Sequence, residues 1–212
     1  MKNIAIITGA SSGMGREFVR QLDGQYEEIW GIGLGQEALD RVKEETKTPF
    51  VGLDLDLTKQ ESFDIIVKML EEEKPNVQFL ANCSGFGKFG RYDEIDVKDS
   101  ANMVDLNCKA LLMMTEYVLP YMKEGGRIVE IASVAGFQPI PYMAVYGASK
   151  AFVVSYARAI NQELKSRKIK VTCVCPFWTK TAFFDRAKAT KAKNEVVTYY
   201  AAMYKPEDVV KK

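Results

Sequence analysis

The chain has 212 residues, of which 47% are hydrophobic and 27% are charged, and its formal net charge is +1. This length predicts a single domain with a substantial core. A net charge close to zero provides no long-range attraction for polyanions, so we expect no nucleic-acid partner. The sequence contains no histidine, which excludes a Ser-His catalytic triad, and we expect no metal site.

Neither a membrane span nor a targeting segment is expected. The longest apolar stretch, residues 110–122, is interrupted by Thr115, Glu116 and Pro120, whereas a membrane helix needs about 20 apolar residues. The apolar run at residues 4–7 is too short for a signal-peptide core. The four cysteines are scattered and predict reduced thiols. We therefore expect a cytoplasmic protein without membrane association.

Short apolar runs alternate with longer segments of helical period, which predicts βαβ units and a parallel α/β sheet covered on both faces, in three layers. The expected strands are residues 3–8, 28–33, 48–53, 77–83, 126–133 and 169–175, and the expected helices are 13–22, 36–45, 59–73, 97–121 and 144–166. Residues 181–205 are polar and carry several basic side chains. We expect this segment to form a helical flap over the functional site.

A glycine-rich turn joins the first strand to the first helix. Gly9, Gly13 and Gly15 form the pattern G-x-x-x-G-x-G. Glycine permits a tight turn and lets the backbone approach a pyrophosphate, which the free N–H groups of the helix start would then face. The alternative is a plain strand-to-helix turn without a ligand. The expected cofactor contacts are Gly9, Ser11, Ser12, Gly13, Met14 and Gly15.

The residues after the second strand distinguish NAD from NADP in many dinucleotide folds. An acid there binds the ribose hydroxyls, and a base favours a 2′-phosphate. Residues 31–36 read Gly-Ile-Gly-Leu-Gly-Gln and contain neither. Arg16 in the first helix is long enough to contact a 2′-phosphate, and this slightly favours NADP as the expected cofactor. A solvated surface arginine is the alternative interpretation.

A second motif carries proton chemistry. Tyr146 and Lys150 are four residues apart and share one helical face. A free phenol has a pKa of about 10, and a nearby ammonium stabilises the phenolate. Tyr146 can therefore exchange a proton with a carbonyl or alcohol oxygen. Ser133, at the carboxyl end of a strand, would donate a hydrogen bond to the same oxygen.

The motifs occur in a consistent order: residues 8–15, Asn-Cys-Ser-Gly at 82–85, Ser133, the pair Tyr146 and Lys150, and a Pro-x-x-x-x-Thr at 176–181. Over essentially its whole length the chain resembles the short-chain dehydrogenase/reductase family in its short single-domain form. The resemblance implies a Rossmann-type doubly wound parallel sheet and an NAD or NADP cofactor. It also implies hydride transfer between a secondary alcohol and a ketone or aldehyde.

The resemblance assigns further roles. Asn107 would hold, through its backbone, a water that relays protons to Lys150, which also binds the nicotinamide ribose. Asp56 and the N–H group of Leu57 would contact adenine, with Asp54 as the alternative if the register is shifted by two residues. The remaining expected cofactor residues are Asn82, Gly85, Tyr146, Pro176, Thr179 and Thr181. The chain departs from the family pattern at Cys83 and Ser84, where Asn-Ala is usual, and at Phe177, where glycine is usual.

Aromatic and aliphatic residues are expected to form a wall for a small apolar substrate, with a core or interface role as the alternative. They are Phe86, Phe89, Phe137, Ile140, Tyr142, Met143, Phe177, Trp178, Phe183 and Phe184. The resemblance implies a homodimer or homotetramer assembled through the two long helices. It also implies a last edge strand, for which this sequence has no candidate.

Two other functions can be distinguished from an oxidoreductase by features of the sequence. A non-catalytic NAD(P)-binding or redox-sensing module would not need Ser133, Tyr146 and Lys150 together, and all three are present. A sugar-nucleotide epimerase of the extended family form would need room for a substrate domain, which a chain of 212 residues does not offer.

Overall fold

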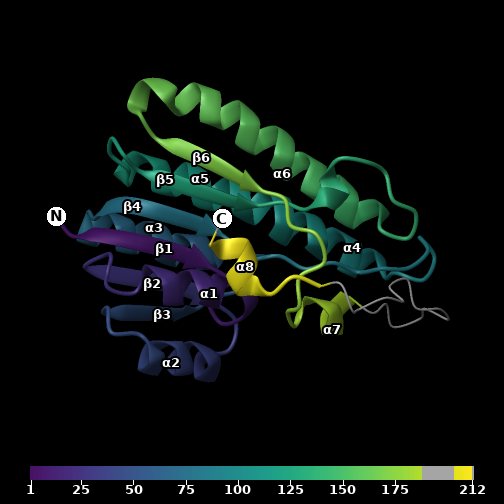
Figure 1. Cartoon of the computed structure of the whole chain (residues 1–212), viewed down its shortest axis with the longest axis horizontal. Helices are drawn as coiled ribbons and strands as arrows, with labels where there is room; N and C mark the ends of the chain where they lie inside the picture. Colours follow the sequence, from purple (N-terminus) through teal and green to yellow (C-terminus); the bar gives the residue numbers. More distant parts are fainter. Residues whose placement is uncertain (188–202, 212) are drawn as a thin grey trace.

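The computed structural model describes residues 1–187 and 203–211, and within them one sheet organises the chain (Figure 1). Its six strands pair in the order β3-β2-β1-β4-β5-β6, and every pair is parallel. The strands are β1 (Asn3–Thr8), β2 (Glu28–Gly33), β3 (Phe50–Asp54), β4 (Asn76–Asn82), β5 (Arg127–Ile131) and β6 (Lys170–Val174). The expected Rossmann-type doubly wound sheet is confirmed.

Helices cover both faces of the sheet because alternate residues of each strand point in opposite directions. Ile4 and Ile6 of β1 pack in one core with α3 (Gln60–Glu73), α5 (Leu111–Val118) and α6 (Ala144–Glu163). Ala5 and Ile7 pack in the opposite core with α1 (Gly13–Leu22), α2 (Gln36–Glu45) and α8 (Pro206–Val210). The result is the three-layer arrangement that the sequence pattern predicts.

Several boundaries differ from the sequence-based expectation. The segment 97–121 is not one regular helix: α4 (Val97–Val104) passes through a π-helical segment (Asp105–Ala110) into α5 and ends in a 3₁₀ turn (Leu119–Tyr121). Strand β3 begins at Phe50 because the N–H group and hydroxyl of Thr48 bind Asp23 instead of a neighbouring strand. Helix α6 ends at Glu163 and continues as a 3₁₀ turn (Leu164–Arg167).

The described part of the expected flap consists of α7 (Phe183–Ala187) and the chain around Tyr204. Thr179 pairs with Tyr204 through an isolated parallel bridge, while residues 188–202 lie outside the described part of the chain. None of the helices within residues 1–187 and 203–211 has the length and apolar composition to cross a membrane.

The strand order indicates where a ligand would bind. β1 has β2 on one side and β4 on the other, so the chain reverses direction across the sheet at this point. In open α/β sheets, ligands bind outside the carboxyl ends of the strands at such a reversal. In Figure 1 the strand arrows point toward the side of the molecule where α7 lies.

Candidate active site

The glycine-rich turn between β1 and α1 is closely packed against the chain around it. Gly9 and Gly13 have φ angles of +68° and +54°, a region that side chains other than glycine rarely adopt. A Cβ on Gly15 would lie 2.2 Å from the carbonyl oxygen of Gly9. The turn therefore requires glycine at these positions.

A groove runs along this turn and across the carboxyl ends of β1, β2 and β4. Most of the expected cofactor residues line it: Gly9, Ser11, Ser12, Gly13, Met14, Gly15, Asp56, Leu57, Gly85 and Thr181. Residues that the sequence analysis did not assign to the site also line it, among them Gly33, Leu34, Leu55, Leu106, Ala182 and Arg186. One oxygen of Asp56 also accepts hydrogen bonds from the N–H group and hydroxyl of Thr58, at 2.9 and 2.8 Å.

The wall of the groove at β4 is fixed by β1. The hydroxyl oxygen of Thr8 accepts hydrogen bonds from the N–H groups of Cys83 and Ser84, both at 3.0 Å. Thr8 is only 1% exposed, so the contact is shielded from water. The Cys-Ser pair that departs from the family pattern is therefore held through its backbone, a contact that does not depend on the side chains.

Ser133, Tyr146 and Lys150 line a second pocket that adjoins the groove, with Met14, Cys83, Gly85, Thr181 and Phe183 shared between the two. Ser133 follows β5, while Tyr146 and Lys150 lie one turn apart on α6. The Nζ atom of Lys150 donates a hydrogen bond to the carbonyl oxygen of Ile131 at 2.8 Å. It lies 5.9 Å from the centroid of the Tyr146 ring. Pro176 and Thr179 line the same pocket.

Burial changes the pKa values of Tyr146 and Lys150. Tyr146 and Lys150 are 8% and 5% exposed. Burial lowers the pKa of Lys150 to about 8, because a buried ammonium loses its hydration. Burial also raises the pKa of Tyr146, against the opposing effect of its hydrogen bond with Ser133. Burial therefore favours the neutral phenol of Tyr146 and makes Lys150 lose its proton more readily than an exposed lysine.

Asn107 lies in the π-helical segment and connects two parts of the site. Its Oδ1 atom accepts a hydrogen bond from the N–H group of Phe86 at 3.0 Å. Its Nδ2 atom donates to the carbonyl oxygen of Phe86 at 2.9 Å and to the hydroxyl of Ser149 at 3.0 Å. The amide thus ties the loop after Gly85 to the helix of Tyr146 and Lys150. Its proton-relay role stays a prediction.

Asn82 lies outside both pockets. It is buried behind them, where its Nδ2 atom donates to Thr115 at 3.0 Å and to Glu130 at 3.1 Å. Glu130 is completely buried and also accepts a hydrogen bond from Thr115 at 2.9 Å. Sequence reasoning missed Glu130, although a lone acid within the apolar run 128–131 was a signal. Burial raises the pKa of Glu130 to about 7.

The expected substrate wall is only partly assembled. Six of its members line the pocket of Tyr146: Ile140, Met143, Phe177, Trp178, Phe183 and Phe184. Phe89 is buried behind them, with its ring centroid 5.8 Å from that of Tyr146 and 5.9 Å from that of Phe183. Phe137 and Tyr142 are more than half exposed and lie outside the pocket. Phe86 lines the cofactor groove instead.

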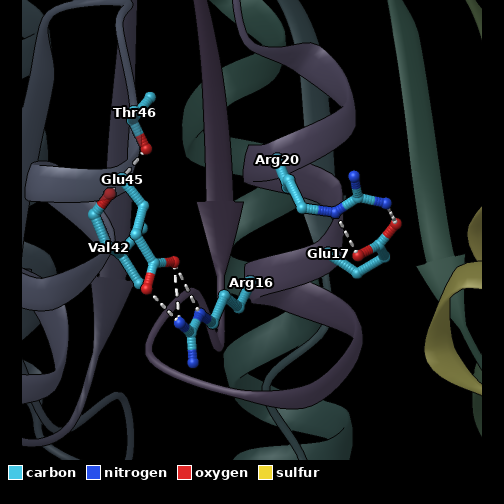
Figure 2. A network of polar contacts seen from close by, with 6 residues as sticks. All are labelled: Arg16, Glu17, Arg20, Val42, Glu45 and Thr46. Carbon is cyan, nitrogen blue, oxygen red and sulfur yellow. Dashed lines mark hydrogen bonds and ion pairs between the residues drawn. The ribbon is translucent and has the colours of Figure 1, made fainter.

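Arg16 is bound within the protein. Figure 2 shows its guanidinium group facing the carboxylate of Glu45 on α2, beside the neighbouring pair of Arg20 and Glu17. The Arg16–Glu45 contact is bidentate, with N–O distances of 2.5 to 3.2 Å. Arg16 is also absent from the residues that line the groove. The geometry therefore gives no support to a 2′-phosphate contact by this side chain.

Comparison with known proteins agrees with this geometry. The family model described as short chain dehydrogenase matches residues 3–192. A sulfoacetaldehyde reductase of Chromohalobacter salexigens is 33% identical over 196 residues, covering 86% of this chain and 75% of the relative. The NADP-dependent 3-hydroxy acid dehydrogenase of Escherichia coli is 30% identical over 211 residues, covering 97% of this chain and 85% of the relative.

Solved structures give the same result. A short-chain dehydrogenase from Sphingobium yanoikuyae, solved in complex with NADPH, superimposes with a TM-score of 0.84 at 26% identity, covering 100% of this chain and 82% of that one. A serine dehydrogenase complexed with NADP⁺ has a TM-score of 0.82 at 28% identity, covering 98% of this chain and 86% of that one. The chain belongs to the short-chain dehydrogenase/reductase family of oxidoreductases.

Proposed function

We propose that the protein interconverts a secondary alcohol and a ketone or aldehyde on a small apolar substrate, with NAD or NADP as the cofactor and Tyr146 as the acid and base. One observation carries this proposal. Tyr146, Ser133 and Lys150 meet in a pocket at the carboxyl end of the sheet, directly beside the glycine-lined groove. The reductase and dehydrogenase names of the relatives support the same class of reaction.

The groove fits a dinucleotide. Its floor is glycine backbone, and a Cβ on Gly85 would lie 3.0 Å from the Oδ1 atom of Asn107 and 3.5 Å from the Nζ atom of Lys150. The missing side chain keeps space open beside Lys150, where a ribose hydroxyl would accept its hydrogen bond. A nicotinamide cofactor bound there would supply the hydride for reduction or accept it during oxidation.

Tyr146 moves the proton. During reduction its hydroxyl donates a proton to the carbonyl oxygen, and during oxidation it removes one from the alcohol. Ser133 already accepts a hydrogen bond from the N–H group of Ala135 at 3.1 Å. The hydroxyl of Ser133 also forms a hydrogen bond with Tyr146, and we expect its hydrogen to turn to the substrate oxygen when a substrate is bound. The hydrogen bond with Ser133 partly opposes the effect of burial on the pKa of Tyr146.

The lining of the pocket argues for an uncharged substrate. Among the described residues that line it, Lys150 is the only basic one, and the outer wall consists of aliphatic and aromatic side chains. A carboxylate or sulfonate, as in the substrates that name two of the relatives, would find among the described lining residues no cation other than Lys150, which already binds the carbonyl oxygen of Ile131. Burial of such an anion without its own cationic partner costs free energy. An aryl ketone such as acetophenone is therefore a better probe than a keto acid.

The test replaces the proton donor without removing its ring. Tyr146→Phe should reduce kcat for acetophenone reduction by at least about 10³-fold while NADH or NADPH still binds. Tyr121→Phe is the matched control, because Tyr121 lies in the 3₁₀ turn after α5, outside both pockets. Its activity should equal that of the wild type.

Three results would overturn the proposal. Normal turnover by Tyr146→Phe would exclude Tyr146 as the acid and base. Binding of a cofactor by the wild type without oxidation or reduction of any ketone, aldehyde or alcohol in a broad panel would favour a non-catalytic binding module. Faster turnover of acetoacetate than of acetophenone would contradict the uncharged substrate class.

A further inference from the structure

The turn between β2 and α2 is held by a carboxylate from the neighbouring strand. Asp54, the last residue of β3, pairs in register with Gly33, the last residue of β2. Its Oδ1 atom accepts a hydrogen bond from the N–H group of Gly35 at 3.0 Å. Its Oδ2 atom accepts one from the N–H group of Gln36 at 3.1 Å. Both oxygens thus lie at the start of α2, and Asp54 itself is not among the residues that line the cofactor groove.

This turn borders the cofactor groove. Gly33 and Leu34 line the groove together with the glycine-rich turn. A Cβ on Gly33 would lie 2.9 Å from the hydroxyl oxygen of Ser11, so the end of β2 and the phosphate-binding turn are in direct contact. In dinucleotide folds the adenosine ribose lies between these two features, and an acid that follows the second strand binds its 2′-hydroxyl.

The local charges disfavour a second phosphate at this place. The free N–H groups at a helix start are natural donors to an anion, but at α2 two of them already bind Asp54. Leu34, half exposed on the same turn, offers no hydrogen bond from its side chain. Arg16 is occupied by Glu45. A 2′-phosphate would therefore lie near the carboxylate of Asp54, and Arg16 would not supply a compensating positive charge.

One basic side chain among the described residues does line the groove. Arg186 lies on α7, five residues after Thr181. A Cβ on Gly13 would lie 3.2 Å from the Cγ2 atom of Thr181, so Thr181 lies beside the glycine-rich turn. Because that turn would face the pyrophosphate, we assign the charge of Arg186 to this group, which both NAD and NADP contain. It therefore does not discriminate between the two cofactors.

We propose that Asp54 makes the protein select NAD(H) over NADP(H), by accepting a hydrogen bond from the 2′-hydroxyl of the adenosine ribose and repelling a 2′-phosphate. The acid that dinucleotide folds commonly carry after β2 is here supplied by the end of β3, which explains why residues 31–36 hold no such acid. The inference rests on the proposed function, since it needs a dinucleotide in the groove. It reverses the slight NADP preference suggested by Arg16 in the sequence.

Cofactor binding tests the proposal without turnover. NADH and NADPH are titrated separately while energy transfer from the two tryptophans is followed, one of which, Trp178, lines the adjoining pocket. The wild type should bind NADH at least about tenfold more tightly than NADPH, because like charges in contact near a protein surface repel by that order. Asp54→Asn should bring the dissociation constants of NADH and NADPH closer together, mainly by strengthening the binding of NADPH.

Two further variants sharpen the test. Glu44→Gln removes one exposed negative charge near the other end of α2 and should leave the NADH/NADPH ratio unchanged. Leu34→Arg places a cation on the turn beside Asp54, and it should strengthen NADPH binding even where Asp54→Asn folds poorly.

The outcomes separate the two proposals. Equal or tighter NADPH binding by the wild type overturns the NAD(H) selectivity and leaves the oxidoreductase function intact. A strong NADH preference that Asp54→Asn does not change overturns the role of Asp54. Binding of neither cofactor overturns the proposed function itself.

Discussion

The buried Glu130 makes a quantitative prediction for the substitution Glu130→Gln. Its carboxyl group is fully buried between β4 and α5, with Asn82 and Thr115 as hydrogen-bond donors. Burial raises its pKa from 4.5 to about 7, against the opposing effects of Thr115, Asn82 and Lys150. At 1.36 kcal/mol per pKa unit, the ionised carboxylate costs the folded state about 3 kcal/mol.

The sign of the pH dependence follows from proton binding. Between pH 4.5 and 7 the folded protein keeps the proton on Glu130, whereas the unfolded chain has lost it. The free energy of unfolding of the wild type therefore falls as the pH rises through this window. Glutamine cannot ionise, so Glu130→Gln should gain about 2 kcal/mol relative to the wild type between pH 5 and pH 8.

The assay is urea denaturation of both proteins at pH 5, 6, 7 and 8. Lys150, whose pKa is lowered to about 8 by burial, also titrates near the upper limit of this range. Because Lys150 is present in both proteins, its contribution to the two free energies of unfolding largely cancels in their difference. Glu71→Gln, at an exposed position of α3, is the control and should show a difference from the wild type that does not change with pH. A constant difference for Glu130→Gln as well would refute the reasoning, since Glu130 would then be ionised in the folded protein throughout this range.

Three further predictions concern the groove, the pocket and the assembly. Gly15→Ala places a Cβ 2.2 Å from the carbonyl oxygen of Gly9 and should weaken cofactor binding at least about tenfold by titration, whereas Gly24→Ala, with open space around it, should not. Phe183→Ala removes a ring 5.5 Å from that of Tyr146 and should raise the KM for acetophenone about tenfold; an unchanged KM would contradict its place in the substrate wall. Light scattering should give a dimer or tetramer, and Phe152→Glu on α6, where Phe152 stacks on Tyr156, should lower the mass; a monomeric wild type would contradict the assembly.

The sheet was predictable because its signals are local. Continuous apolar runs such as 3–8 and 28–33 mark strands buried on both faces, and both match β1 and β2 in the structure. Tyr146 and Lys150 were also predictable, since their spacing on one helix fixes their shared face. In each case, neighbouring residues carry the whole pattern.

The rest depends on contacts between distant segments. No spacing rule connects Asp54 to Gly35, or Glu130 to Asn82, because each pair is joined across neighbouring strands. Arg16 was expected near a cofactor phosphate, yet its partner Glu45 is 29 residues away on another helix. Phe137 and Tyr142 were expected in the substrate wall because aromatic residues favour such pockets, but the turn before α6 leaves them exposed.

The π-helical segment at Asp105–Ala110 sets the rotational phase between the two halves of a long helix. Met103 before it packs in the small core around Tyr146, and Met114 after it packs in the main core under the sheet. One residue corresponds to about 100° of helical rotation. Deleting a single residue here would therefore turn Thr115 away from Glu130 or Asn107 away from Phe86. The irregular segment allows one continuous helix to serve both the active site and the interior.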